Sequence, residues 1–161
     1  MEESITLKDF LGFYKKTMEM GPVDAGTYSP LVLAYIGDAV YEVMIRAKVI
    51  NKGSIQVSKL HKRSAELVKA GTQAAMIRLL EEDLTEEEHA VYKRGRNAKS
   101  ATMAKHATMV DYRTATGFEA LVGWLFLEER FDRLTELVSL GLTKIGAMET
   151  KTTPAPEQKG E

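Results

Sequence analysis

The chain has 161 residues, a net charge of −1, 44% hydrophobic residues and 28% charged residues, values typical of a single globular domain. It contains no cysteine, which excludes a disulfide framework, a thiolate metal site and a cysteine nucleophile. The near-neutral charge also argues against a protein that binds nucleic acid through its overall positive charge, so any such contact must come from a local basic patch.

The sequence gives no sign of membrane targeting. Residues 1–4 are acidic and lack the layout of a signal peptide. The most apolar stretch, residues 31–50, contains Asp38, Glu42 and Arg46, which favours a buried core helix over a membrane span. We therefore expect a cytoplasmic protein without membrane contact.

Helical periodicity runs along most of the chain, and no segment alternates as a strand does, which predicts an all-α fold of about six helices. The first helix is predicted over residues 7–20, with a linker after it. Ser29 and Pro30 form a helix start, because Ser is a favoured N-cap and Pro is favoured at the first helical position. The helix that they start is expected to reach residue 50.

Two further helices are predicted in the middle of the chain. Ser54 is expected to cap the first, which breaks or bends at Gly71 and ends near residue 82. Thr85 begins a capping box for the second, which is expected to end near Gly95. The later segments are a long surface loop over 96–111 and helices over 112–128 and 131–145. The domain division is an N-terminal helix and linker at 1–25, one helical domain at 26–148 and a disordered tail at 149–161.

Acidic residues interrupt the apolar surfaces of two predicted helices. The apolar stripe of the helix that starts at Pro30 is predicted to run through Leu31, Ala34, Tyr35, Tyr41 and Ile45. Asp38 lies in the middle of this stripe, and Glu119 is surrounded in the same way by apolar neighbours. Since a buried, unpaired carboxylate is costly, each acid needs a cation. That cation is either an Arg or Lys at a helix crossing or a metal ion.

A glycine accompanies each of these acids. Gly37 precedes Asp38, and Gly123 lies one turn after Glu119. A glycine costs roughly 1 kcal/mol in a helix interior, so we interpret both as sites of close helix packing. Such packing would bring the two acids within reach of one ion. Carboxylate ligands favour a hard cation, Mg²⁺ or Mn²⁺, which commonly serves phosphodiester hydrolysis.

Residues 93–100 hold four cationic side chains and no acid. One interpretation is a solvated helix end whose cations complement the helix dipole. The other is a patch whose Arg and Asn donors contact a nucleic-acid backbone. The candidate binding residues are Lys93, Arg94, Arg96, Asn97, Lys99, Lys105 and Arg113.

Two motifs resemble those of ribonuclease III domains. The first, at residues 35–42, reads YIGDAVYE and resembles the signature helix in which an apolar pair precedes Gly-Asp. The second, at residues 116–123, reads TGFEALVG and resembles the Phe-Glu-Ala-Leu motif that is followed by a small residue. Together with residues 94–100, which read RGRNAKS, they are similar to the Mini-ribonuclease III group of that family.

The resemblance implies an all-helical ribonuclease III-like endonuclease domain that forms a two-fold homodimer and cleaves double-stranded RNA. By motif position, Asp38 and Glu119 are the catalytic residues and the ligands of Mg²⁺, with Mn²⁺ as a possible substitute. The implied substrate is the precursor of large-subunit (23S) ribosomal RNA. Only a short tail follows Ile145, so we expect the catalytic body itself to bind the RNA.

The chain departs from larger ribonuclease III enzymes at three acidic positions. Leu31 and Ala34 stand where those enzymes carry glutamates, and Thr116 stands where they carry an aspartate. We therefore expect one firmly held ion. The missing acids leave open a non-catalytic RNA-binding or ribosome-assembly protein on the same fold. A plain helical interaction module with ion-paired acids is a third hypothesis.

Overall fold

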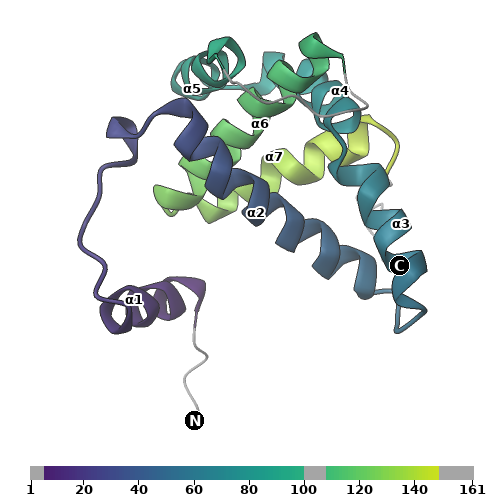
Figure 1. Ribbon diagram of the computed structural model, residues 1–161, viewed down its shortest axis with the longest axis horizontal. Coiled ribbons are helices and arrows are strands. Elements are labelled where there is room, and N and C mark those ends of the chain that lie inside the picture. The colour runs from purple at the N-terminus through teal and green to yellow at the C-terminus, as the bar shows by residue number, and fades with distance from the viewer. Residues whose placement is uncertain (1–5, 100–107, 149–161) are drawn as a thin grey trace, which may run out of the picture.

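The computed structural model describes residues 6–99 and 108–148 (Figure 1). In those ranges all regular structure is helical, which confirms the predicted all-α class. No helix there combines the length and apolar character that a membrane crossing requires. The elements are α1 (Leu7–Thr17), η1 (Ala25–Thr27), α2 (Pro30–Ile50), α3 (Val57–Val68), α4 (Ala70–Leu80), η2 (Glu81–Asp83), α5 (Glu86–Asn97), α6 (Met109–Leu127) and α7 (Phe131–Lys144).

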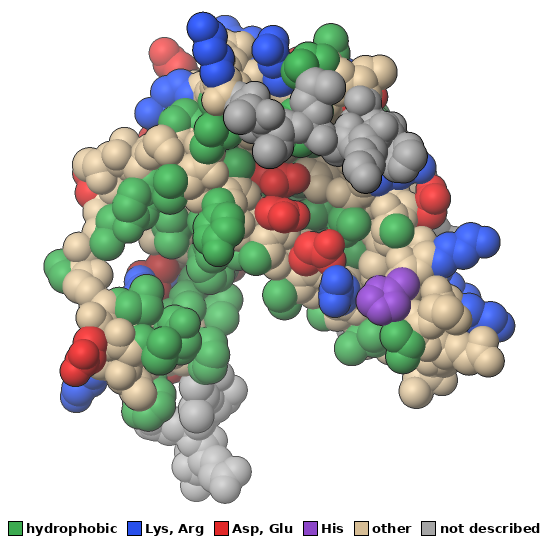
Figure 2. Space-filling model, in the orientation of Figure 1, with side chains coloured by type: hydrophobic (Ala, Val, Ile, Leu, Met, Phe, Trp, Pro, Cys, Tyr) green, Lys and Arg blue, Asp and Glu red, His purple; other side chains and the backbone are tan. Residues whose placement is uncertain are grey.

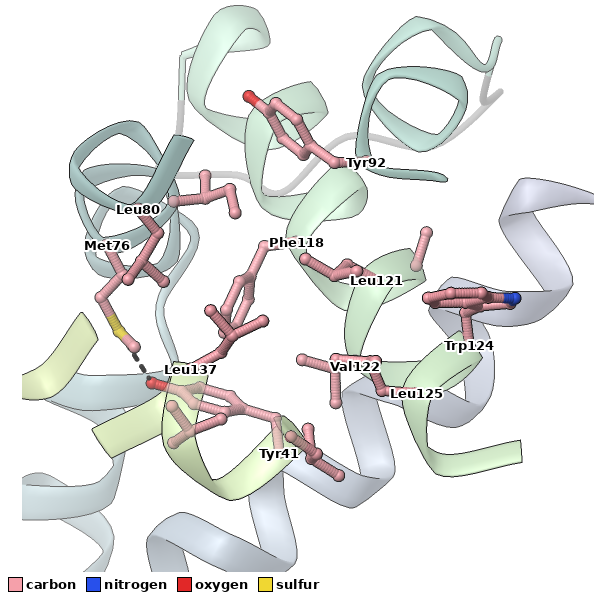
Figure 3. Packing of buried hydrophobic residues seen from close by; sticks show 14 of the residues in the cluster. Tyr41, Met76, Leu80, Tyr92, Phe118, Leu121, Val122, Trp124, Leu125 and Leu137 are labelled. Carbon is pink, nitrogen blue, oxygen red and sulfur yellow. Dashed lines mark hydrogen bonds between the residues drawn. The ribbon is translucent and has the colours of Figure 1, made fainter. Parts of the chain in front are cut away.

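Helices α2 and α6 cross at the centre of the fold, with α4, α5 and α7 packed around α6 (Figure 1). The predicted start of α2 is confirmed: the Ser29 side chain accepts a hydrogen bond from the Val32 amide, and Pro30 is the first helical residue. Figure 3 shows the core formed at this crossing, where the Tyr41 ring meets the Phe118 ring edge to face at 5.2 Å. The Tyr41 hydroxyl donates to the carbonyl of Leu67 at 2.7 Å, which ties α2 to the end of α3.

The crossing of α2 and α6 depends on two glycines. A Cβ atom on Gly37 would lie 2.8 Å from the backbone nitrogen of Gly123 and would overlap the carbonyl of Glu119. A Cβ on Gly123 would lie 3.0 Å from the nitrogen of Gly37 and would overlap the carbonyl of Leu33. The two backbones are therefore in direct contact, which confirms the predicted close packing at both glycines.

Two predicted boundaries in the middle of the chain are wrong. The chain breaks at Lys69, whose backbone is extended (φ −63°, ψ 151°), whereas Gly71 lies inside α4. Ser54 does not cap α3, which begins three residues later with Gln56 at its N-cap. Gly and Ser are general markers of helix ends, but they do not mark the ends of α3 and α4.

The predicted ends of α5 and α6 also need correction. The Thr85 capping box is confirmed, but α5 does not end at Gly95. Gly95 is buried inside the helix, and a Cβ there would lie 2.8 Å from the Cβ of Ala120 on α6. At the other side of the predicted loop, α6 already begins at Met109. Residues 100–107 and the predicted tail at 149–161 lie outside the described residues.

An ion pair in the interior joins α5 to α7. Glu88 is only 2% exposed, and the Arg133 guanidinium donates to both of its carboxylate oxygens at 2.8 Å. Glu88 also completes the capping box with the backbone amide of Thr85. Burial alone raises the pKa of Glu88, but hydrogen bonds from Arg133 and Thr85 and the charge of Arg133 hold it below its usual value. This acid is therefore structural and fully paired.

Helix α1 stands apart from the helical body (Figure 1). It ends at Thr17, three residues earlier than predicted, and an exposed segment over 18–24 links it to η1. An apolar groove of about 450 Å³ lies between α1 and the body. Its lining residues include Leu7 and Phe10 of α1, Val40 and Val43 of α2, and Phe131 of α7. Helix α1 thus forms one wall of the groove.

Candidate active site

The crossing of α2 and α6 brings Asp38 and Glu119 together. The Cα of Gly37 faces the carbonyl of Glu119, so Asp38, the next residue on α2, lies at the same point of the crossing. Burial and then the negative charge of Asp38 raise the pKa of Glu119 to about 8. Burial and the charge of Glu42 raise the pKa of Asp38 as well. The two carboxylates are therefore close enough that a negative charge on Asp38 disfavours ionisation of Glu119.

Asp38 lies at a different place on its helix from the one predicted. Ala34, Tyr41 and Ile45 are buried, but Tyr35 is 82% exposed and Asp38 is exposed too. The buried stripe of α2 runs through Leu33, Ala34, Gly37, Tyr41, Ile45 and Val49. Asp38 therefore borders the core and faces outward, whereas Glu119 is partly buried. An ion bound between them would remain open to solvent and substrate on the Asp38 side.

No basic side chain neutralises the pair within the described residues. The ion pairs formed in residues 6–99 and 108–148 include neither Asp38 nor Glu119. Glu42 is engaged elsewhere on α2, where its carboxylate accepts a hydrogen bond from Arg46 at 2.9 Å. The interpretation of the two acids as partners of Arg or Lys therefore finds no support in this part of the chain.

The donor set suits a hard divalent cation. In the described ranges, no three His, Cys, Asp or Glu side chains gather into a metal-binding cluster. Two carboxylates with open space for water and phosphate oxygens are the arrangement by which proteins usually hold Mg²⁺. The raised pKa of Glu119 shows that the metal-free site disfavours a second negative charge. A bound cation would neutralise this repulsion and favour the ionised carboxylate.

Gln73 is a neighbour of this site that the sequence analysis missed. It lies on α4, is only 1% exposed, and its Nε2 donates to the carbonyl of Val68 at 2.8 Å. A hydrogen bond from its side chain lowers the pKa of Glu119, against the effect of burial and of Asp38. A polar residue beside the apolar run from Ala74 to Ile77 is the signal that could have found it, since the same reasoning identified Asp38.

The candidate RNA-binding residues gather around the end of α5. Lys93, Arg94, Asn97 and Lys99 are exposed there, and Arg113 is exposed on α6. Figure 2 shows Lys and Arg side chains along the upper edge of this face and acidic side chains near its centre. Lys105 lies outside the described residues.

Arg96 differs from the other residues of this basic group. Its guanidinium lies over the Tyr92 ring, 5.4 Å from the ring centre, and 3.9 Å from a carboxylate oxygen of Glu81. The Arg96 guanidinium therefore already interacts with groups of the protein itself, which makes it less available to RNA than its exposed neighbours. The end of α5 is fixed to α6 next to the site, because Gly95 packs against Gly117 and Ala120, the second a neighbour of Glu119.

Comparison with known proteins agrees with this geometry. A profile of the Ribonuclease III domain family matches residues 31–130, a range that contains both Asp38 and Glu119. The chain belongs to the ribonuclease III domain family. The predicted resemblance is confirmed, and within the family the chain falls among the Mini-ribonuclease 3 proteins.

Individual relatives of the ribonuclease III domain family are similar over most of their length. The Mini-ribonuclease 3 of Clostridium tetani is 51% identical over 118 residues, which cover 73% of this chain and 78% of the relative. The Enterococcus faecalis protein is 46% identical over 75% of this chain and 93% of its own. A crystal structure of a Fusobacterium nucleatum protein superimposes with a TM-score of 0.67 at 28% identity and covers 73% of this chain and 90% of that one.

Membership of the ribonuclease III family decides between the hypotheses from the sequence. The protein is an endoribonuclease of this family, as predicted. The hypothesis of a plain interaction module fails, because the chain belongs to this family of endoribonucleases.

Proposed function

We propose that this protein is a Mg²⁺-dependent endoribonuclease that cleaves both strands of double-stranded RNA. We propose further that it matures the precursor of large-subunit (23S) ribosomal RNA in the cytoplasm. One observation carries the proposal: the glycine crossing places Asp38 beside Glu119, and no basic residue pairs with either acid in the described part of the chain. Mn²⁺ has the same preference for oxygen ligands and would substitute for Mg²⁺.

In this mechanism Asp38 and Glu119 hold the divalent ion through their carboxylate oxygens. When bound, the ion supplies an activated water for attack on phosphorus and stabilises the charge that develops on the phosphate. Both carboxylates must be ionised for this, and mutual repulsion disfavours that state in the free protein. The direct contact between the backbones of α2 and α6 keeps the acids together despite this repulsion.

The basic residues near the end of α5 are proposed to hold the RNA backbone against this site. Duplex RNA is recognised mainly through its shape, its phosphates and its 2′-hydroxyls. Lys93, Arg94, Asn97 and Lys99 can donate to phosphate oxygens without any sequence preference. Since α5 packs on α6 through Gly95, this contact would place a phosphate beside the acids. Lys105 and Arg113 would extend the same surface.

The proposed two-fold dimer would supply two such sites, one for each RNA strand. Helix α2 presents an apolar face to solvent, on which Tyr35 is 82% and Val43 is 68% exposed. This face continues into the groove beside α1, where Figure 2 shows hydrophobic side chains gathered. A contiguous apolar surface of this kind on a soluble protein is typical of an interface with another protein.

The dimer is tested by measuring mass in solution with light scattering. We expect a dimer for the native protein and a monomer for Val43→Asp. Leu79→Asp is the control, because Leu79 is an exposed apolar residue on α4, away from this face. A monomeric native protein, or a dimer that Val43→Asp leaves intact, would overturn the proposed interface.

The catalytic proposal is tested by incubating the protein with precursor ribosomal RNA, with and without Mg²⁺, and mapping the new ends. Asp38→Asn and Glu119→Gln should each slow cleavage on the order of a hundredfold or more, because each removes a charged ligand of the metal ion that would act on the reacting phosphate. Asp132→Asn, at the start of α7, is the control and should cleave like the native protein. A native protein that binds duplex RNA without cutting it would refute the assignment of these two acids as a catalytic site.

A further inference from the structure

Gln73 carries a buried acceptor without a hydrogen-bond partner. Its Oε1 is the one such side-chain atom in the described part of the chain. The orientation of the amide is fixed, because Nε2 donates to the carbonyl of Val68 at 2.8 Å. Reversing the amide would place two acceptors against each other at that point. An unsatisfied buried acceptor is unfavourable and calls for a functional or structural reason.

The same side chain lies beside the acid pair. Helix α4 packs on α6, and the Gln73 amide is close enough to Glu119 to lower the pKa of that carboxyl. Because Oε1 belongs to the same small amide group, the unpaired oxygen also lies next to Glu119. A protonated Glu119 carboxyl can donate to this oxygen in the metal-free protein, but an ionised carboxylate only accepts hydrogen bonds. When a bound ion keeps both acids ionised, the partner of this oxygen must be a donor from outside the protein chain, such as water.

We propose that Gln73 is a positioning residue of the metal site, an inference that rests on the proposed function. Its Nε2 steadies the Glu119 carboxylate, and its Oε1 accepts a hydrogen bond from a water molecule in the shell of the divalent ion. Mg²⁺ keeps several water ligands, and each of these donates hydrogen bonds outward. Groups that orient such ligands strongly affect the affinity for the metal.

This assignment also explains how a site with only two such carboxylates would hold the divalent ion. Thr116, Ala34 and Leu31 occupy positions where the larger enzymes are expected to carry carboxylates. Thr116 brings no negative charge to the site, and its hydroxyl donates to the backbone carbonyl of Tyr112. A neutral amide on α4 supplies an acceptor for the water shell without adding a third negative charge to Asp38 and Glu119.

The test measures Mn²⁺ binding to the full chain by electron paramagnetic resonance, without RNA. Gln73→Leu removes both polar atoms and should weaken Mn²⁺ binding at least tenfold, while its melting temperature in EDTA stays within a few degrees of native. Gln73→Glu retains an acceptor and should bind Mn²⁺ within about threefold of native. In EDTA its melting temperature should be lower than that of the native protein, because a third carboxylate joins the acid pair. Addition of Mn²⁺ should restore the melting temperature to the native value.

The control is Thr114→Val, which removes another buried polar side chain whose hydroxyl bonds to the backbone, at 2.8 Å from the carbonyl of Val110. It should leave Mn²⁺ affinity unchanged. If Gln73→Leu binds Mn²⁺ like the native protein while Asp38→Asn does not, Gln73 is a structural residue and the inference fails although the proposed function stands. If Mn²⁺ binding to the native protein is absent or insensitive to Asp38→Asn, both fail together.

If Gln73→Leu does not fold, Gln73→Glu decides the question by itself. Recovery of its melting temperature by Mn²⁺ supports the inference. A tenfold loss of Mn²⁺ affinity in this variant overturns it, because the acceptor is retained. The Mg²⁺ concentration for half-maximal cleavage should follow the same order, rising at least tenfold in Gln73→Leu relative to Gln73→Glu.

Discussion

The Cα of Gly37 on α2 rests against the carbonyl of Glu119 on α6, with no room for a side chain between them. This contact sets the distance between the helices that carry the two acids. We expect Gly37→Ala to lower the free energy of unfolding by at least about 2–3 kcal/mol, because the added methyl group forces the two backbones apart. Chemical denaturation measures this change.

Gly12→Ala is the matched control for that substitution. Gly12 lies inside α1, and a Cβ there meets nothing within 4 Å. This variant should be as stable as the native protein or more stable by ~0.5–1 kcal/mol, since Ala favours the helix. A Gly37→Ala variant with native stability and native Mn²⁺ affinity would show that the helices tolerate a wider separation.

The raised pKa of Glu119 makes the metal-free protein less stable as pH rises. In the unfolded chain this carboxyl ionises near its usual pKa of about 4.3, whereas in the folded protein it retains its proton up to about pH 8. The folded state thus binds more protons between these values, so its stability falls across this range and levels off above it. Denaturation in EDTA between pH 5 and 9 should show this decline in the native protein and a smaller one in Glu119→Gln. Parallel curves for the two proteins would contradict it.

The buried pair of Glu88 and Arg133 predicts a loss of stability on the acid side. The pKa of Glu88 is held below its ordinary value, so its contribution is complete above the pKa of the unfolded chain and is lost as pH falls through the lower value of the folded protein. Arg133→Leu should cost about 3–5 kcal/mol at neutral pH, because it leaves a buried carboxylate unpaired. Glu136→Gln removes the exposed partner of the same arginine and should change stability by less than ~1 kcal/mol. Equal effects of the two substitutions would count against a special role for Glu88.

The basic residues of α5 should contribute unequally to RNA binding. Arg94→Ala should weaken binding to duplex RNA and reduce the slope of log affinity against log salt by about one, as expected for a lost phosphate contact. Arg96→Ala should have a smaller effect on that slope, because its guanidinium already lies over Tyr92 and near Glu81. Lys15→Ala on α1 is the control. Titrations at several salt concentrations measure the slopes, and an unchanged slope for Arg94→Ala would remove it from the interface.

The sequence predicted most of the helices because their starts carry local chemistry. The caps at Ser29 and Thr85 act within four residues, so they can be recognised without the fold. Glycines were harder to interpret, because the same residue ends one helix and packs against another. Gly37 and Gly123 could be assigned to packing from the neighbouring acids, whereas Gly95 was mistaken for a helix end. Its real partner, Ala120, is 25 residues away in the sequence.

The acid pair was predictable, and its surroundings were not. Asp38 and Glu119 stand among apolar residues in the sequence, so each is visible there, although Asp38 borders the buried stripe of α2 and is exposed. Gln73 stands beside an apolar run, which is a weak local signal, but its place next to Glu119 depends on the bend at Lys69 and on the packing of α4 on α6. The exposure of Tyr35 was missed for a similar reason, since a wide apolar stripe does not reveal which edge faces solvent.

The exposed segment over 18–24 has a practical consequence for handling the protein. It is the natural point of attack for a protease, because it lies outside regular structure and few contacts hold it. Glu19, with a backbone φ of 54°, offers an accessible site for an enzyme that cuts after glutamate. A brief digestion would detach α1 and leave the eight described helical elements from η1 to α7 as one fragment. That fragment would report how much of the solubility and assembly of the protein depends on its first 19 residues.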